Sequence, residues 1–388
     1  MSRPPDGLRI VRVANFVTPV SGGLRTALRH LGEGYLAAGH RPVLVVPGRR
    51  RTDESTPQGR VITLPGRPVP GSGGYRVLTD RRAVARTLAE LAPDRLEVSD
   101  RTTLRWTGAW ARAQGVRSMM VSHESATGLL GTWGAPAGTA RTLADRLNAR
   151  TARAYDTVLC TTAWAAAEFE RIGATNLARA PLGVDLAQLH PDFRDPQVRA
   201  RYAEPGQVLL VLCSRLSPEK RPERALEALA VLRRRHRMPA VLAVAGAGPL
   251  RRRLEARAAE LRLPVRFLGH LGGRAEVAAL LASADAVLAP GPVETFGLAA
   301  LEALACGTPV AVSRSSALPP IVGSAGLAAD DSGEGFATAV RELLARPAEQ
   351  RRAAARARAE VFGWESAVAA FLAAHRVPTP VGRPEAAP

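Results

Sequence analysis

The sequence of 388 residues is longer than one hydrophobic core usually serves, and 46% of its residues are hydrophobic, so we expect a soluble protein of two domains. Its formal net charge of +18 favours anionic ligands, but the basic residues are spread over the whole chain and no recognised nucleic-acid-binding module is present, which argues against a nucleic-acid partner. No apolar run approaches the ~20 residues that a membrane-spanning helix needs.

The first seven residues are polar and lead straight into an apolar strand, without the pattern of a secretory signal. We therefore expect a cytoplasmic protein, at most peripheral on the inner face of the cell membrane. The three cysteines (Cys160, Cys213 and Cys306) lie far apart and are typical of buried thiols in a reducing compartment. The histidines lack metal-ligand spacing with other side chains, so we expect no bound metal.

The amino-terminal part reads as a strand, a glycine turn and a helix. An apolar strand over residues 8–14 is followed by Ser21-Gly22-Gly23 and by apolar residues at helical spacing over 24–35. Residues 43–46 read as the next strand. A glycine-rich turn at a helix start presents backbone N–H groups to phosphates, so Gly22 and Gly23 are candidate ligands of a diphosphate. A simple tight turn is the alternative.

Short apolar runs then alternate with helical stretches along the chain. They lie at residues 61–64, 96–98, 119–122 and 157–160 and, after a second strand-turn-helix start at 208–232, at 241–245, 265–268, 286–289 and 310–312. Strands that are apolar on both faces and alternate with helices are typical of parallel, doubly wound sheets. The fold class predicted is therefore α/β, with two Rossmann-like domains.

Composition also predicts the domain boundaries. We expect an amino-terminal domain over residues 1–186, a polar and proline-containing linker over 187–206, and a carboxy-terminal domain over 207–376. The final helical stretch, from residue 348, could return to the amino-terminal domain. The proline-rich residues 377–388 are expected to form a disordered tail.

The turn after the strand at residues 208–213 carries two candidate phosphate ligands. Its sequence, Ser-Arg-Leu-Ser-Pro-Glu-Lys, places Arg215 and Lys220 at the carboxyl edge of the predicted parallel sheet, where ligands bind in this architecture. A planar guanidinium and a mobile ammonium suit the two phosphates of a diphosphate. Lys220 is the only lysine among 53 basic residues, which favours a ligand role over a solvated charged turn.

Two carboxylates bracket the start of a predicted helix. Glu294 lies in the loop after the strand at residues 286–289, and Glu302 lies about two turns into the helix. The backbone N–H groups at the helix start, those of Phe296, Gly297 and Leu298, would face an anion bound there. The alternative is a capping acid followed by an ordinary surface glutamate.

The order of these motifs resembles the retaining enzymes of glycosyltransferase family 4. The segment Glu294-Thr-Phe-Gly297, followed by Glu302-Ala-Leu-Ala-Cys-Gly-Thr-Pro-Val310, carries the resemblance. It extends over nearly the whole chain, through Ser21-Gly22-Gly23, residues 214–220, Gly246-Ala-Gly248-Pro249, Phe267-Leu-Gly269 and Ala284-Asp285. Enzymes of this family have the GT-B fold, so the resemblance implies that the two domains face each other across a central cleft.

The resemblance also implies roles for individual residues. Glu294 would contact the transferred sugar, and Glu302 would hold the ribose hydroxyls. Arg215 and Lys220 would bind the diphosphate and stabilise the departing nucleotide. His123 matches a histidine near the reacting sugar, although a histidine after a strand is more often structural when taken alone.

The remaining donor contacts implied by the resemblance lie on loops of both domains. Gly22 and Gly23 would approach the donor phosphates, and Leu268 and His270 would border the base. Gly246 matches a donor-binding glycine. Here the chain reads Gly-Ala-Gly-Pro where relatives commonly read Gly-Asp-Gly-Pro, which puts one base or sugar contact in doubt.

The passages Val-Ala-Asn-Phe, Ser-Gly-Gly-Leu-Arg-Thr-Ala and Ala-Pro-Leu-Gly-Val-Asp-Leu resemble bacterial GDP-mannose-dependent mannosyltransferases that build phosphatidylinositol mannosides. We therefore expect retaining transfer of mannose from GDP-mannose to a glycolipid-type acceptor, with no cofactor. Arg101 to Ala113 reads as a helix in which Trp106 and Trp110 stand beside arginines, a pattern that suits an anionic membrane surface. An interior-facing tryptophan pair is the alternative.

Three other functions remain open from the residues alone. A family 4 enzyme could use a UDP-sugar and a small-molecule or polysaccharide acceptor. A sugar-nucleotide epimerase could share the fold, but it would not need the paired glutamates with the Arg215 and Lys220 set. A nicotinamide dehydrogenase would need Gly-x-Gly-x-x-Gly after the first strand, which is absent in register.

Overall fold

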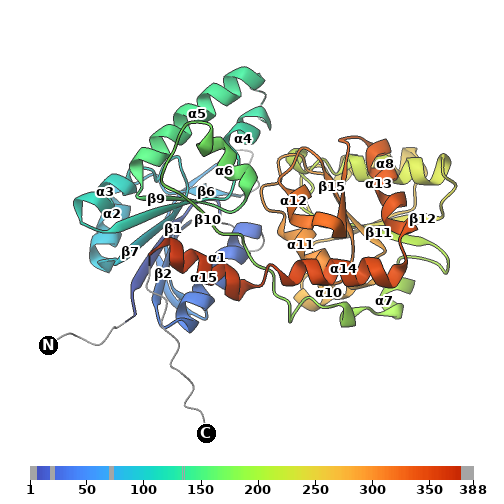
Figure 1. Ribbon diagram of the computed structural model, residues 1–388, viewed down its shortest axis with the longest axis horizontal. Coiled ribbons are helices and arrows are strands. Elements are labelled where there is room, and N and C mark those ends of the chain that lie inside the picture. Colours follow the sequence, from blue (N-terminus) through green and yellow to red (C-terminus); the bar gives the residue numbers. More distant parts are fainter. Residues whose placement is uncertain (1–6, 18–21, 70–73, 133, 135, 377–388) are drawn as a thin grey trace, which may run out of the picture.

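The computed structural model describes residues 7–17, 22–69, 74–132, 134 and 136–376. It consists of two α/β domains that lie side by side (Figure 1). The amino-terminal domain contains an eight-stranded sheet in the order β10-β9-β8-β7-β1-β2-β4-β3, in which every pairing is parallel except that of β3 with β4. A short antiparallel pair, β5 with β6, stands apart from this sheet.

The elements of the amino-terminal domain follow the alternation that the sequence predicts. The strands are β1 (Arg9–Ala14), β2 (Arg41–Gly48), β3 (Thr52–Thr56), β4 (Gly59–Pro65), β5 (Arg67–Pro68), β6 (Arg76–Val77), β7 (Arg95–Ser99), β8 (Arg117–Ser122), β9 (Thr157–Cys160) and β10 (Leu177–Arg179). The helices are α1 (Gly23–Ala37), α2 (Arg81–Leu91), α3 (Thr107–Ala113), α4 (Ala126–Thr132), α5 (Ala137–Ala154) and α6 (Ala163–Glu170).

The carboxy-terminal domain contains a six-stranded, entirely parallel sheet in the order β13-β12-β11-β14-β15-β16. Its strands are β11 (Val208–Cys213), β12 (Ala240–Ala245), β13 (Val265–Gly269), β14 (Ala286–Ala289), β15 (Val310–Ser313) and β16 (Gly326–Ala329). Its helices are η2 (Pro218–Lys220), α8 (Glu223–Arg234), α9 (Arg251–Glu260), α10 (Arg274–Ser283), α11 (Leu298–Ala305), α12 (Leu318–Val322), η3 (Gly323–Ala325), α13 (Gly333–Ala345) and α14 (Ala348–Glu360).

The strands form where the chain is apolar at consecutive positions rather than at alternate ones. All six residues of β12, Ala-Val-Leu-Ala-Val-Ala, are buried, because helices cover both faces of the sheet. In a parallel sheet the strand ends of one polarity gather at one edge, so the loops that leave the carboxyl ends lie together. These loops carry most of the candidate residues.

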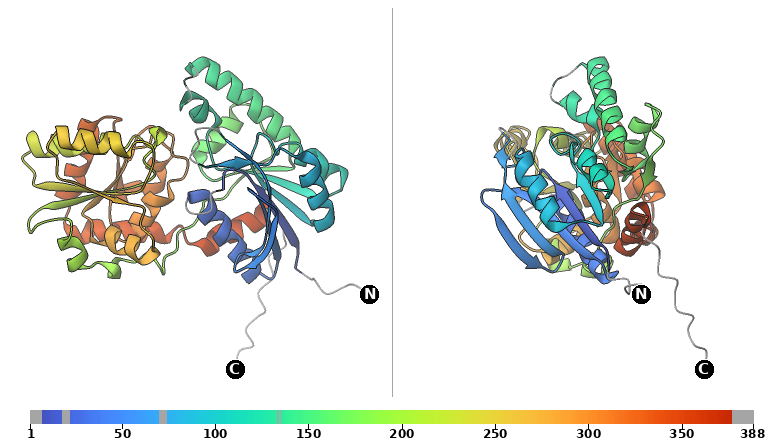
Figure 2. Two further views of the ribbon diagram at one scale, coloured as in Figure 1. Left: turned by 180° about the vertical axis from the view of Figure 1, so that it is seen from behind. Right: turned by 90° about the vertical axis from the view of Figure 1, so that its left-hand side faces the viewer.

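Two segments connect the domains. Residues 187–206 contain η1 (Pro191–Phe193) and α7 (Pro196–Ala200), which pack on α10 of the second domain, and Arg199 forms an ion pair with Asp285 at 2.8 Å. The last helix, α15 (Trp364–Ala374), leaves the second domain and lies against α1 of the first (Figures 1 and 2). There the ring of Trp364 stacks on that of His30, with centroids 4.7 Å apart.

The predicted fold is confirmed, and all the predicted strands are present. The strands β3, β10 and β16, which the sequence analysis did not predict, complete the edges of the two sheets. One predicted helix is wrong in extent. Helix α3 begins only at Thr107, because the carboxylate of Asp100 accepts hydrogen bonds from the backbone N–H groups of Thr102 and Leu104 and holds the intervening residues in turns.

Candidate functional site

The predicted site residues of the two domains meet where the domains face each other. The side chain of Thr295, from the loop before α11, donates a hydrogen bond to the backbone carbonyl of His123, which follows β8. The guanidinium of Arg215 donates to the phenol oxygen of Tyr75 at 3.0 Å. These contacts cross from one domain to the other, and they bring the carboxyl edges of the two sheets to one place.

Lys220 and Glu294 form an ion pair at the centre of this region. Lys220 ends η2, and Glu294 lies in the loop between β14 and α11, so the pair joins the loops that follow two adjacent strands. Both side chains are about three-quarters buried, with relative exposures of 25% and 24%. A small cavity of about 30 Å³ lies beside them, and its lining includes Ser214, Gly291 and Leu318.

Arg215 lies beside this pair and is more exposed. Its guanidinium forms an ion pair with Glu219 at 2.6 Å, while the Tyr75 hydroxyl accepts from its other nitrogen. Burial alone would raise the pKa of Glu219, but the hydrogen bond from Ser217 and the charges of Arg215 and Lys220 hold that pKa below its usual value. The guanidinium of Arg215 therefore lies between the carboxylate of Glu219 and the hydroxyl of Tyr75.

Helix α11 begins at this point with no side-chain cap. Its N-cap, Gly297, has φ 68°, a left-handed conformation that favours glycine, and an added Cβ there would lie 2.3 Å from a methyl carbon of Leu318. The N–H groups at the start of α11, including that of Leu298, are therefore available to an anion. The ring of Phe296 is buried and packs edge-on against that of Phe362, so Phe296 contributes its backbone rather than its side chain.

Glu302 lies on the same helix, and its carboxylate is paired. The guanidinium of Arg274, the first residue of α10, donates to it at 2.8 Å. Burial raises the pKa of Glu302, and Arg274 opposes that shift only in part. Sequence reasoning missed Arg274, because nothing local to a helix-initial arginine indicates a carboxylate 28 residues further along the chain.

The glycines of the second domain allow two loops to approach closely. Gly246 has φ 146°, and a Cβ at this position would lie 1.9 Å from the backbone oxygen of Ser214. At Gly248 a Cβ would lie 2.3 Å from the backbone oxygen of Leu216. The loop after β12 is thus packed directly on the loop that carries Arg215, which gives Gly246 a structural role whatever it binds.

Two predicted base contacts stand further along the same sheet edge. Leu268 and His270 lie at the carboxyl end of β13, which is separated from β11 by β12. Leu268 is half-buried against the core, and His270 is exposed. These two residues therefore lie at the edge of the site, away from the ion pair of Lys220 and Glu294.

The glycine pair of the first domain faces the start of α11. Gly22 is the N-cap of α1 with φ 128°, and Gly23 is its first residue. An added Cβ on Gly23 would lie 3.3 Å from a methyl carbon of Leu298. The two helix starts therefore oppose each other across the domain boundary. Ser21, the first residue of the predicted turn, lies outside the described residues.

His123 is held by buried polar neighbours. Its Nε2 lies 3.0 Å from the hydroxyl oxygen of Ser99, and burial lowers the pKa of His123 to about 4, so the imidazole is neutral near pH 7. The guanidinium of Arg101 donates to the backbone oxygen of the next residue, Glu124, at 2.7 Å, and to Asn148 at 2.8 Å. A buried arginine thus fixes the loop that positions His123.

The same contacts correct one expectation about a membrane surface. Arg101 has 1% relative exposure, so it does not belong to a basic surface patch beside the tryptophans. Trp106 and Trp110 are half-buried and pack against the core of the first domain. They therefore match the interior-facing alternative more closely than a membrane-facing pair.

Two surveys of the molecule add to this description. Across the residues that the structure describes, no group of three or more His, Cys, Asp or Glu side chains is placed to hold a metal ion. Within the same residues, no helix is both long enough and apolar enough to cross a membrane.

Comparison with known proteins covers both domains. Residues 195–360 match the family model for glycosyl transferases group 1, and residues 22–183 match that for a glycosyl transferase 4-like domain. The chain is 51% identical to a GDP-mannose-dependent alpha-(1-6)-phosphatidylinositol dimannoside mannosyltransferase of Mycobacterium tuberculosis, over 94% of this chain and 95% of that one. It is 29% identical to a glycogen synthase of Mycobacterium tuberculosis, over 95% of both chains. The sucrose-phosphate synthase of Thermosynechococcus elongatus has the same fold, with a TM-score of 0.78, 21% identity, and 95% and 98% of the two chains covered.

Proposed function

The chain belongs to the group 1 glycosyl transferases, and we propose that it transfers mannose from GDP-mannose to a hydroxyl of a phosphatidylinositol mannoside-type glycolipid. The observation that carries this proposal is the convergence of Lys220, Glu294 and the uncapped start of α11 on one point at the domain boundary. The donor follows from the relative that is 51% identical over nearly its whole length, whose name states GDP-mannose as its donor.

The proposed chemistry requires positive charge where the leaving phosphate develops negative charge. The bond between the anomeric carbon and the phosphate oxygen breaks, and its electron pair goes to the diphosphate. Arg215, Lys220 and the N–H groups at the start of α11 are placed to stabilise that charge. The acceptor oxygen bonds to the same face of the anomeric carbon, so configuration is retained, and its proton goes to the donor phosphate.

Glu294 and Glu302 have separate places in this proposal. Glu294 would contact the transferred sugar, and its ion pair with Lys220 keeps it next to the proposed diphosphate ligand. When the donor phosphates bind, they compete for Lys220 and leave the Glu294 carboxylate free to accept hydrogen bonds from sugar hydroxyls. Glu302, which is deeper and paired with Arg274, would accept hydrogen bonds from the ribose hydroxyls.

We propose that the reaction uses neither a cofactor nor a metal ion. The diphosphate carries about two negative charges, and Arg215 and Lys220 supply two positive charges beside it. The amino end of α11 adds roughly half a positive charge. These groups can take the part that a divalent cation takes in other sugar-nucleotide enzymes.

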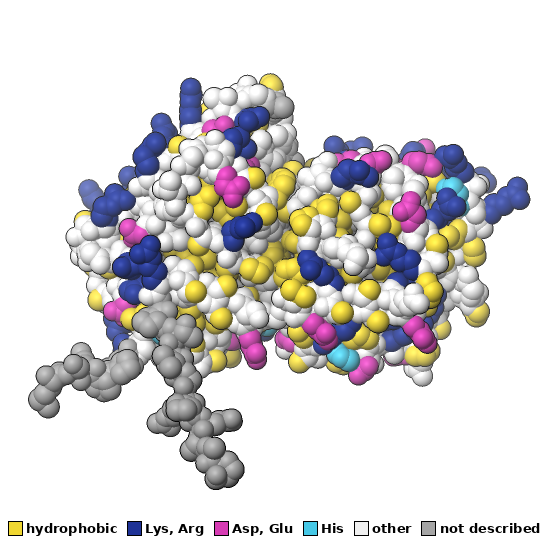
Figure 3. Space-filling model, viewed as in Figure 1, with side chains coloured by type: hydrophobic (Ala, Val, Ile, Leu, Met, Phe, Trp, Pro, Cys, Tyr) yellow, Lys and Arg dark blue, Asp and Glu magenta, His cyan; other side chains and the backbone are white. Residues whose placement is uncertain are grey.

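We propose that the acceptor binds to the first domain. His123 lies where the two domains meet: its backbone carbonyl accepts from Thr295, while its neutral imidazole contacts Ser99. On the face shown in Figure 3, hydrophobic side chains gather along the boundary between the domains, with basic side chains around them. Such a surface suits the acyl chains and anionic head group of a glycolipid, so we propose peripheral association with an anionic membrane.

The experiment supplies GDP-mannose labelled in the sugar together with phosphatidylinositol mannosides in mixed vesicles. The proposal expects a lipid product that is one hexose larger and that an α-mannosidase cleaves. If the label enters water-soluble oligosaccharides instead, the acceptor assignment fails while the donor assignment stands. If GDP-mannose does not react and labelled UDP-sugars supplied in parallel do, the alternative family 4 donor is correct.

A further inference from the structure

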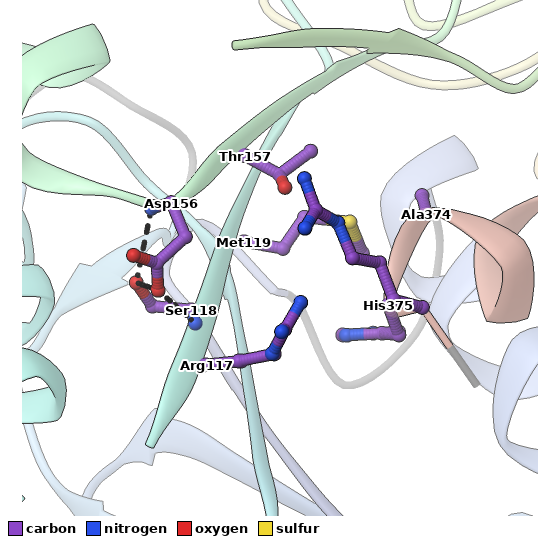
Figure 4. A pocket seen from close by; sticks show the side chains of 8 residues that line it. Arg117, Ser118, Met119, Asp156, Thr157, Ala374 and His375 are labelled. Atoms are coloured by element: carbon purple, nitrogen blue, oxygen red, sulfur yellow. Dashed lines mark hydrogen bonds between the residues drawn. The ribbon is translucent and has the colours of Figure 1, made fainter. Parts of the chain in front are cut away.

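A second cavity lies far from the proposed transferase site. It has a volume of about 350 Å³ and is formed by the first residues of β8 and β9 together with the end of α15 (Figure 4). Because these are the amino ends of parallel strands, the cavity opens at the edge opposite to the one that carries His123. Strand β8 runs from Arg117 at the cavity to Ser122 beside His123, a span of about 17 Å.

Arginines dominate the charge of this cavity. Arg117 and Arg376 line it, and within the described part of the chain neither guanidinium has a carboxylate at ion-pair distance. Arg95, the first residue of the neighbouring β7, donates to the backbone oxygen of His375 at 3.0 Å. Burial lowers the pKa of Arg95 and the charge of Arg117 lowers it further, while Asp94 opposes the shift in part. The guanidiniums of Arg95 and Arg117 therefore repel each other at the edge of the cavity.

One carboxylate, that of Asp156, lines the cavity, and a second, that of Glu97, lies behind it; both have partners within the protein. Asp156 accepts from the backbone N–H of Ser118 at 2.8 Å and from its hydroxyl at 2.9 Å, and these two residues lie on the other side of β8 from the Arg117 side chain (Figure 4). Glu97, with 1% exposure, lies behind His375 and faces Arg12 at 3.5 Å. An anion in the cavity would therefore meet two arginines and one lining carboxylate, that of Asp156, which is hydrogen-bonded to Ser118.

We propose that this cavity is a second anion site, which binds a phosphate-bearing ligand between Arg117 and Arg376. A cavity of 350 Å³ accommodates a pyrophosphate or a small organic phosphate. Planar guanidiniums bind phosphate oxygens in pairs, and the hydroxyl of Thr157 adds a donor to the lining. A ligand here would join the first domain to the last helix, because Arg117 begins β8 and Arg376 follows α15.

The test uses the full chain with saturating GDP, so that the donor site is already filled. Inorganic pyrophosphate is titrated calorimetrically into the wild type and into the Arg117→Gln, Arg376→Gln double variant. The matched control is Arg81→Gln with Arg82→Gln, two exposed arginines at the start of α2 in the same domain. Circular dichroism checks that each variant is folded.

We expect one pyrophosphate to bind the GDP-saturated wild type and the control, with an affinity that falls as salt rises, and to bind the double variant at least about tenfold more weakly. No binding to GDP-saturated wild type, or equal affinity in the double variant, overturns the proposal. Failure of GDP itself to bind would instead count against the proposed transferase site.

The source of the phosphate is separated by a vesicle experiment. Phosphatidylcholine vesicles with and without phosphatidylinositol are sedimented with each protein. If the inositol lipid carries down the wild type but not the double variant, and pyrophosphate releases it, the ligand is a lipid head group. If sedimentation is the same for both proteins while pyrophosphate still discriminates between them, the ligand is a soluble phosphate. Both results support an anion site at Arg117 and Arg376.

Discussion

Arg215 of the second domain is held by Tyr75 of the first, through a hydrogen bond of 3.0 Å to the phenol oxygen and a guanidinium carbon 5.4 Å from the ring centroid. Tyr75 packs edge-on against Phe16, with centroids 6.1 Å apart, so its ring is itself supported. The proposed phosphate ligand of one domain is thus oriented by an aromatic residue of the other. The orientation of Arg215 therefore depends on how the two domains meet.

We predict that Tyr75→Phe lowers kcat/KM for the donor about fivefold, because one hydrogen bond to a partly exposed cation is lost while the ring remains. Tyr75→Ala also loses the cation–π contact and should lower kcat/KM about 30-fold. Steady-state kinetics with unchanged melting temperatures check this. Tyr202→Phe, in the segment that connects the domains, is the control. If Tyr75→Phe has wild-type kinetics, Tyr75 does not position Arg215.

Gly246→Ala should destabilise the protein and weaken the donor site together. A Cβ at this position would lie 1.9 Å from the oxygen of Ser214 and would occupy φ 146°. We expect the free energy of unfolding to fall by about 2–4 kcal/mol and GDP affinity to fall with it, because the loop of Arg215 must move. Denaturant unfolding and GDP titration measure the two effects.

The matched control is Gly272→Ala, where an added Cβ meets nothing within 4 Å. Its unfolding free energy should stay within roughly 0.5 kcal/mol of wild type. A Gly246→Ala protein as stable as this control would show that the close approach to Ser214 is not required.

We predict that the free energy of unfolding decreases as the pH is lowered from about 6.5 to about 4, because of His30 at the domain junction. Burial, and then Arg29, lower the pKa of His30 to about 4, while in the unfolded chain it titrates near 6.5. Over this interval the unfolded chain binds a proton that the native protein does not. The contribution of His30 to the unfolding free energy is therefore complete above pH 6.5 and is lost as the pH falls. The slope from one such group is at most about 1.4 kcal/mol per pH unit.

His30→Gln should make this part of the stability profile less steep, while His190→Gln, at an exposed position, should leave its slope unchanged. Urea unfolding at several pH values measures this slope for each protein. The stacked partner of His30 is Trp364, so its fluorescence should follow the same transition. Equal slopes in all three proteins would contradict the assignment to His30.

Mannose transfer should continue at the same rate in excess EDTA, because Arg215, Lys220 and the start of α11 supply the positive charge that the leaving diphosphate needs. Product formation with and without chelator, on protein dialysed against EDTA, is the measurement. A loss of activity that Mg²⁺ or Mn²⁺ restores would show that these groups do not suffice.

The fold was largely predictable because the strands are locally apolar. The residues of β12 are buried on both faces, and such a run is typical of a central parallel strand. Two edge strands lack this signal: β3 is polar and antiparallel, and the Gly-Leu-Ala-Ala sequence of β16 has no β-branched side chains. Arg101 was misplaced on a surface helix, because its burial depends on partners as distant as Asn148.

The site was predictable where a motif is continuous and not where it is assembled by folding. Lys220 and Glu294 were identified from their own loops, and the structure pairs them. Tyr75 and Arg274 were not, because Tyr75 lies 140 residues from Arg215 and Arg274 acts through Glu302 on another helix. These two contacts depend on how the two domains, and two helices of the second domain, pack together. A local sequence pattern does not predict that packing.

The most direct test measures donor binding and slow donor hydrolysis with GDP-mannose, UDP-glucose and UDP-N-acetylglucosamine. Wild type is compared with Lys220→Ala and Glu294→Ala, and the control is Arg252→Ala on the exposed face of α9. We predict that wild type and control bind and cleave GDP-mannose, and that each site variant lowers cleavage by about 10²-fold or more. A wild-type protein that binds no sugar nucleotide, or site variants as active as the control, would contradict the account.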